Sequence, residues 1–127
     1  MKKERKNRKP PARPRPWPAL KTVRIARAAA AEKKAEAIVA LDMRASSSLA
    51  DVFFICTAQN ERQAEAIVSA IRDGLKAEGI PIRATEGLPE GRWVVMDCGD
   101  VLIHVFLPAV RAFYSLETLW GDAPKLK

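Results

Sequence analysis

The chain has 127 residues, a hydrophobic fraction of 48% and a formal net charge of +7, values that fit one globular domain with an ordinary core. Residues 1–24 hold ten Lys or Arg against one Glu, so the remainder of the chain is mildly acidic. That distribution argues against nucleic-acid binding by the folded part, because phosphate binding needs a basic face. No stretch approaches the roughly 20 apolar residues of a membrane span, and no apolar run could act as a secretory signal, so we expect a cytoplasmic protein.

Residues 1–21 are predicted to form a disordered basic tail. The first 18 residues contain five of the nine prolines of the chain. Proline disfavours regular helix and favours an extended, solvated backbone. Two interpretations of the tail stay open: it only adds solubility, or its charge contacts RNA.

The first elements after the tail are a helix and two strands. The Ala-rich, charged segment from Thr22 to Glu36 predicts a helix with Thr22 as its N-cap. AIVALDM (residues 37–43) and DVFFICTA (residues 51–58) are short apolar runs, typical of buried strands. Because both runs are apolar on both faces, we expect them at central positions of a sheet or in a sheet covered on both sides.

A second helix follows, with the clearest local signals in the chain. Asn60 and Gln63 fit a capping box, and Gly79 is a stop signal. Gly74 lies inside this helix at a cost of roughly 1 kcal/mol relative to Ala, which either fraying or close packing explains. Apolar residues recur at helical spacing between the cap and the stop: Ala64, Ile67, Val68, Ile71 and Leu75. Residues 80–85 are predicted to form a short strand.

The last elements are a hairpin and a helix. Residues 93–97 and 101–107 form the hairpin strands, which turn at Cys98-Gly99-Asp100. Pro108 can open the final helix, whose apolar stripe comprises Val110, Phe113, Leu116 and Trp120. The fold class is therefore α/β: a single domain over residues 22–122, with a mixed sheet of about five strands flanked by helices. Residues 123–127 are predicted to be a short C-terminal tail.

No catalytic or metal-binding signature is present in the sequence. A lone strand histidine such as His104 is more often structural than catalytic, and Asp97, Asp100 and His104 have no metal-ligand spacing. Cys56 and Cys98 lie in or beside apolar strands without a CxxC motif, which indicates reduced core residues. We therefore expect no catalytic residue, no metal and no cofactor.

The remaining candidate site is an aromatic surface. In the first hairpin strand Trp93, Val95 and Asp97 share one face, and Val94 and Met96 share the other. If Val94 and Met96 point inward, Trp93 is partly exposed, on a surface that we expect to include Leu88 and Arg92. Trp, Tyr and Arg dominate interface hot spots, so this set predicts a docking face. The alternative interpretation is that Trp93 only covers the edge of the core.

Residues 28–122 resemble the ribosomal silencing factor (RsfS) family, also called the Iojap or YbeB-like family. The resemblance includes AEAIVALDMR with SSSLADVFFIC, and TAQNERQAEAI at the middle helix. Its most specific part is EGLPEGRWVVMDCGDVLIHVF followed by RAFYSLETLW, with the spacing G(x)5W(x)3D(x)6H(x)6R(x)2Y(x)2E(x)2W. This pattern is met by Gly87, Trp93, Asp97, His104, Arg111, Tyr114, Glu117 and Trp120.

The resemblance implies a fold related to nucleotidyltransferases but without their catalytic residues. It also implies binding to ribosomal protein fourteen of the large ribosomal subunit, which sterically blocks subunit association and represses translation, and related members assist large-subunit biogenesis. By residue type, Phe113 and Trp120 are assigned structural roles. The predicted partner-binding residues are Leu88, Arg92, Trp93, Asp97, Tyr114 and Glu117.

Three alternatives stay open at this point. A diverged nucleotidyltransferase would use Asp42, Asp51 or Asp97 with a divalent metal. A general RNA binder would depend on the basic tail, which the resemblance does not cover. A homodimer could also cover an aromatic docking face.

Overall fold

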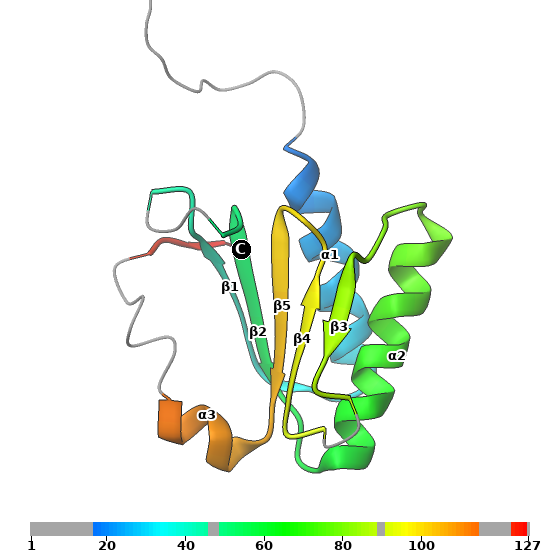
Figure 1. Ribbon diagram of the computed structural model, residues 1–127, viewed down its shortest axis with the longest axis vertical. Coiled ribbons are helices and arrows are strands. Elements are labelled where there is room, and N and C mark those ends of the chain that lie inside the picture. Colours follow the sequence, from blue (N-terminus) through cyan, green and yellow to red (C-terminus); the bar gives the residue numbers. More distant parts are fainter. Residues whose placement is uncertain (1–16, 46–48, 89–90, 115–122, 127) are drawn as a thin grey trace, which may run out of the picture.

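The protein is a mixed sheet with its two long helices on one face (Figure 1). The computed structural model describes residues 17–45, 49–88, 91–114 and 123–126. Its elements in chain order are α1 (Pro18–Glu32), β1 (Glu36–Asp42), β2 (Val52–Thr57), α2 (Glu61–Ala77), β3 (Ala84–Glu86), β4 (Trp93–Asp97), β5 (Val101–Phe106), α3 (Pro108–Tyr114) and β6 (Lys125–Leu126).

The six strands have the order β3-β4-β5-β2-β1-β6. Among the described strands, β2 and β5 run parallel, and every other neighbouring pair runs antiparallel. Strand β2 is buried along its whole length, as its continuous apolar sequence predicts for a central strand. The predicted α/β class with a mixed sheet is confirmed, with one strand more than expected.

Helix α1 begins at Pro18, earlier than the predicted start at Thr22. Proline suits the first turn of a helix because it lacks only an N–H that would have no partner there. Thr22 lies inside the helix and is buried, so its predicted role as N-cap is wrong. The helix ends at Glu32, before the predicted end at Glu36. Two residues further on, Lys34 adopts a φ of 66°. Residues 18–21, predicted to belong to the tail, are therefore helical.

Helix α2 confirms the prediction made from its caps and spacing. The Asn60 side chain accepts a hydrogen bond from the Gln63 backbone N–H at 2.8 Å, and the five predicted apolar residues are all buried. A Cβ at Gly74 would lie 2.9 Å from Cγ2 of Ile25 in α1. Close packing between the two helices therefore explains this glycine.

The strand predicted over residues 80–85 is replaced by the shorter β3 (Ala84–Glu86). The Ile80 backbone N–H donates to the Leu75 carbonyl at the end of α2, and Pro81 has no N–H to give to a sheet. Ile80 and Ile82 instead pack against the core under the helices. At the other edge of the sheet, β6 pairs with β1, so part of the predicted C-terminal tail is ordered as a strand.

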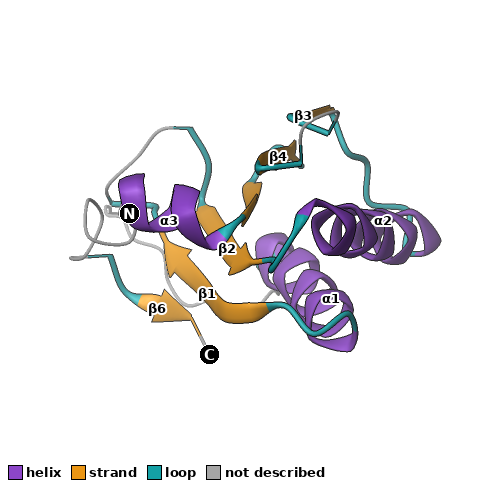
Figure 2. Ribbon diagram, turned by 90° about the horizontal axis from the view of Figure 1, so that it is seen from below, coloured by secondary structure: helices purple, strands orange, loops and turns teal. Residues whose placement is uncertain are grey.

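Two apolar clusters lie on opposite faces of the sheet. The larger cluster is formed by α1, α2 and the strand residues that face them, among them Phe54, Val94, Met96 and Ile103. Figure 2 shows α1 and α2 together on that face and α3 on the other. The smaller cluster lies on the α3 side and comprises Leu41, Met43, Ala50, Phe53, Ile55, Phe106 and Ala123, with Trp93, Leu102, Val39 and Val110 at its border.

None of the described helices is both long enough and apolar enough to span a bilayer. Cys56 and Cys98 are buried and free of disulfides, as predicted for core residues. Burial raises the pKa of the Cys56 thiol to about 12 and that of Cys98 to about 11, so neither forms a reactive thiolate at neutral pH.

Candidate functional site

The face of the sheet opposite α1 and α2 carries the candidate docking site at strands β3, β4 and β5. Burial alternates along β4, with Val94 and Met96 facing the helices and Trp93, Val95 and Asp97 half-buried on the other side. This is the predicted alternation. A hollow of about 280 Å³ opens here, lined by Ala84, Glu86, Val95, Asp97 and Leu102. We call these five residues together with Trp93 the docking face.

Trp93 is fixed in place by its neighbours on β5. Its ring centroid lies 5.0 Å from that of Phe106, its cross-strand partner. Its indole Nε1–H donates to Nδ1 of His104 at 3.3 Å. The half-buried ring therefore packs at the border of the smaller core, and part of its surface stays accessible to solvent. Both interpretations of Trp93, core edge and docking residue, fit this position.

His104 is the polar support beneath Trp93. It is 6% exposed, stacks on Phe106 with ring planes 2° apart, and also contacts the Phe53 ring at 5.3 Å between centroids. Burial lowers the pKa of its imidazole to about 4, so the ring is neutral at physiological pH. Because Nδ1 accepts a hydrogen bond, the single proton lies on Nε2, which has no partner within the described part of the chain.

Gly87 sets the path of the chain into Trp93. Its φ of 90° lies in a region that residues with a side chain rarely adopt. A Cβ at this position would lie 2.2 Å from the Trp93 carbonyl oxygen. Two structural features therefore favour glycine at this first position of the sequence motif: the positive φ and the close approach of the Trp93 backbone.

We expect Gly87→Ala to lower the free energy of unfolding by about 2 kcal/mol, from the strained φ and the displaced Trp93 backbone. Gly79→Ala is the matched control, because Gly79 also has a positive φ (72°) but no atom within 4 Å of the added methyl group. Gly79→Ala should lower the free energy of unfolding by about 1 kcal/mol. Urea unfolding of both variants measures the two changes. If both variants lose the same free energy of unfolding, the close approach to Trp93 makes no contribution to the cost of Gly87→Ala.

The other predicted contact residues of this region do not all share the docking face. Leu88 packs against the cluster under α1 and α2, on the opposite side from Trp93, and not beside it as expected. Arg92 is exposed and directly precedes Trp93. Asp97 lies on the docking face at the far end of β4, about 13 Å along the strand from Trp93. Its carboxylate accepts the Gly99 backbone N–H at 2.8 Å and so holds the hairpin turn.

Arg111 connects helix α3 to the sheet through hydrogen bonds. This residue is 8% exposed, and its guanidinium donates to the Ala37 carbonyl at 2.8 Å and to the Thr57 hydroxyl at 2.6 Å. These contacts reach β1 where its pairing with β2 is irregular and Ala37 has a φ of 50°. Arg111 is therefore structural. Tyr114 ends α3, but its side chain and that of Phe113, like the whole of Glu117 and Trp120, lie outside the described residues.

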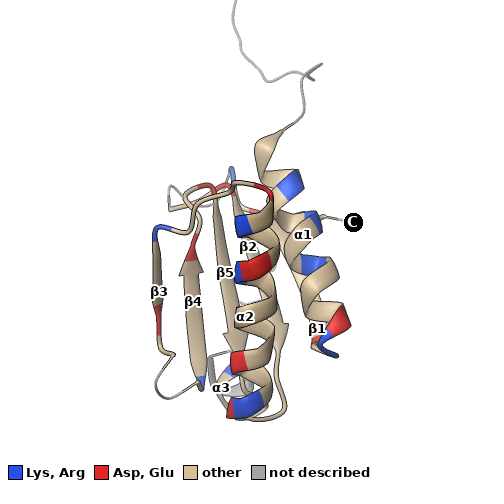
Figure 3. Cartoon of the chain, turned by 90° about the vertical axis from the view of Figure 1, so that its right-hand side faces the viewer, with Lys and Arg blue, Asp and Glu red and all other residues tan. Residues whose placement is uncertain are grey.

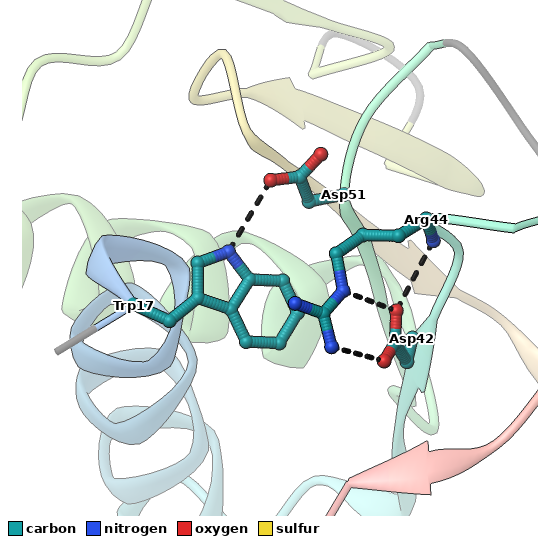
Figure 4. Close-up of polar contacts among 4 residues, drawn as sticks. All are labelled: Trp17, Asp42, Arg44 and Asp51. Carbon is teal, nitrogen blue, oxygen red and sulfur yellow. Dashed lines mark hydrogen bonds and ion pairs between the residues drawn. The ribbon is translucent and has the colours of Figure 1, made fainter. Parts of the chain in front are cut away.

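The carboxylates proposed for a diverged nucleotidyltransferase are engaged in separate contacts. Asp42 binds the Arg44 guanidinium at 3.0 and 2.7 Å, and these hydrogen bonds lower the pKa of its carboxyl group. Asp51 accepts the Trp17 indole N–H at 3.2 Å (Figure 4). Asp97 holds the hairpin turn. Within residues 17–45, 49–88, 91–114 and 123–126, no three His, Cys, Asp or Glu side chains are grouped to hold a metal ion.

The sequence profile described as "Ribosomal silencing factor during starvation" matches residues 16–127. The chain belongs to the ribosomal silencing factor family. The RsfS protein of Bacillus subtilis (strain 168) is 47% identical over 102 residues, which cover 80% of this chain and 86% of that protein. The resemblance seen in the motif residues is thus confirmed.

Two solved structures have the same fold. A crystal structure from Chromobacterium violaceum superposes with a TM-score of 0.78 at 36% identity and covers 80% of this chain and 85% of that one. A crystal structure from Bacillus halodurans gives 0.75 at 39% identity, covering 85% and 98%. The ribosomal silencing factor profile begins at residue 16, so it includes Trp17, whose contacts with Asp51 and Arg44 the sequence did not reveal.

Proposed function

We propose that this ribosomal silencing factor binds the large ribosomal subunit through ribosomal protein fourteen and sterically blocks subunit association. The observation that carries the proposal is the docking face. It has apolar residues and one aromatic residue, Trp93, on a sheet surface that neither α1 nor α2 covers. A rigid sheet with a supported Trp suits protein recognition, because little side-chain entropy is lost on binding.

Charge on the docking face favours a basic partner. The two charged residues that line the hollow, Glu86 and Asp97, are both acidic. They lie on neighbouring strands, where Figure 3 shows acidic positions on β3 and β4. A basic protein surface would therefore complement the face, and a bare RNA phosphate would be repelled.

The proposed mechanism is steric exclusion. A domain seated on the subunit-joining side of the large subunit occupies space that the small subunit would fill, so translation is repressed without a chemical step. This proposal assigns the protein no catalytic residue, no metal and no cofactor, and it places the protein in the cytoplasm with its ribosomal partner. A role in large-subunit biogenesis would use the same contact.

Co-sedimentation with separated small subunits, large subunits and joined ribosomes tests the proposal. Retention on free large subunits alone, with reduced formation of joined ribosomes when small subunits are added, is the expected result. Equal retention on all particles would leave only nonspecific attraction to RNA and would overturn the docking proposal. A homodimer that buried the docking face would compete with large subunits, and sedimentation of the free protein at several concentrations detects it.

A further inference from the structure

The edge of the sheet at β3 forms a second candidate binding surface. Among the described strands, β3 pairs only with β4 and is therefore the outer strand on this side of the sheet (Figure 3). The unpaired backbone groups of an edge strand can pair with a strand of another molecule. Ala84 and Glu86 belong to the docking face, whereas Thr85 pairs with Met96 and shares its side of the sheet, toward the helices.

A hollow of about 490 Å³ adjoins β3 on the helix side. Its walls come from the end of α2, the connection after α2 and β3 itself, and they include Arg72, Lys76, Ile80, Pro81, Ile82 and Thr85. The charged side chains of this hollow are both basic. Those of the docking-face hollow, on the other side of β3, are both acidic. The two hollows therefore suit binding groups of opposite charge.

Contacts within the domain do not explain the two cations. Arg72 and Lys76 lie one turn apart on α2, and like charges at this spacing slightly destabilise a helix. Neither forms an ion pair within the part of the chain that the structure describes. Lys76 lies in the last turn and complements the helix dipole, but Arg72 precedes that turn. The pair therefore favours an anionic group from another molecule.

The charges around β3 disfavour a second copy of the chain at this edge. Antiparallel pairing of two β3 strands would place Arg72 and Lys76 of both copies on one side of the joined sheet. Both Glu86 side chains would lie on the other side, so like charges would repel on each side.

An RNA strand also fits this edge poorly. Its phosphates would meet the two cations, but they would be repelled by Glu86 and would gain nothing from the apolar wall of Ile80 and Pro81. An extended protein segment offers backbone groups to β3, an apolar stem to the wall and a carboxylate to the cations. A protein segment is thus the occupant that matches every component of the surface.

We propose that the edge of β3 and the adjoining hollow, together the β3 edge site, bind an extended segment of a partner protein. The segment pairs with β3 as an additional strand and places a Glu or Asp side chain in the hollow beside Arg72 and Lys76. Because side chains alternate along a strand, the residues on either side of this acid point to the docking-face side, where Glu86 favours a basic residue. The partner sequence is therefore an alternation of acidic with basic or small apolar residues.

Selection from random peptides tests the β3 edge site without a ribosome. The probe is a phage-displayed library of peptides of about nine residues, longer than a typical strand, selected on the full-length protein. Enriched peptides are synthesised, and fluorescence anisotropy measures their affinity for the wild type and for Arg72→Gln/Lys76→Gln. The matched control is Arg24→Gln/Arg62→Gln, which removes two exposed cations of α1 and α2 outside the hollow. Far-UV circular dichroism checks the fold of each variant.

We expect enriched peptides to carry Glu or Asp in an alternating pattern. Arg72→Gln/Lys76→Gln should weaken their binding about tenfold, and the control variant less than about twofold, because both variants have the same net charge. Trp93→Ala should leave peptide affinity unchanged, since Trp93 does not line the hollow. Hydrogen exchange measured by NMR should show slower exchange of the Ala84–Glu86 amides when the peptide is bound.

Several results would overturn the β3 edge site: no enrichment, enriched peptides without acidic residues, equal losses in the two Gln variants, or unchanged exchange in β3. Binding of poly(uridylic acid) that Arg72→Gln/Lys76→Gln weakens and the control does not would assign the hollow to RNA instead. Protection of β3 that increases with protein concentration in the absence of peptide would assign the edge to a second copy. Failure of the domain to dock on large subunits would change none of these results, so the two proposals fail separately.

Discussion

Trp93→Ala is expected to weaken binding to large ribosomal subunits about 30-fold, which corresponds to roughly 2 kcal/mol, the size of an interface hot spot. The indole is half-buried at the border of the docking face, fixed by Phe106 and His104. Its truncation removes the aromatic surface that we propose as the partner contact, together with the contacts to Phe106 and His104 that hold the ring in place. Equilibrium co-sedimentation or fluorescence titration with large subunits measures the loss.

Two controls separate binding from stability. Trp93→Phe keeps an aromatic ring against Phe106 but removes the indole N–H, so it should retain most of the affinity. Leu20→Ala removes an exposed apolar side chain (41% exposed) from α1, on the other side of the sheet, and should leave binding unchanged. An effect of Trp93→Ala below about 0.5 kcal/mol, in a protein that remains folded, would remove Trp93 from the interface.

Elements with strong local signals could be predicted from the sequence. The capping residues Asn60 and Gln63, the apolar stripe of α2 and the alternation along β4 are all set by neighbours close in the chain, and the structure confirms them. The alternation also gave the correct face for Trp93 and Asp97. Periodicity therefore identified the middle of the docking face.

The remaining features depend on contacts distant in sequence. Residue Trp17 holds the start of α1 through Asp51, 34 positions away, and no local rule predicts that pairing. Strand β6 has two residues, too few to show any periodicity. Leu88 was expected on the same surface as Trp93, but it packs against the cluster under α1 and α2. An apolar residue outside a strand has no alternation that would assign it to one face of the sheet.

The docking face also depends on the protonation state of one buried histidine. His104 supports Trp93 as a neutral acceptor, and a protonated ring would direct a second N–H at the indole N–H across 3.3 Å. Its pKa is lowered to about 4 by burial, below the unfolded value of 6.5. The unfolded chain therefore takes up this proton first as the pH falls. Between pH 6.5 and 4 the histidine progressively destabilises the fold, and above pH 6.5 it has no such effect.

We expect this single group to remove about 3 kcal/mol from the free energy of unfolding between pH 7 and pH 4. His104→Gln is the matched variant, because a buried amide oxygen can still accept the Trp93 N–H but cannot be protonated. Carboxylates titrate in both proteins, so the prediction concerns the difference between their two pH profiles, measured by urea unfolding. Parallel profiles would mean that His104 is protonated as easily in the folded protein as in the unfolded chain. Burial would then have no effect on the protonation of His104, the acceptor of the Trp93 hydrogen bond.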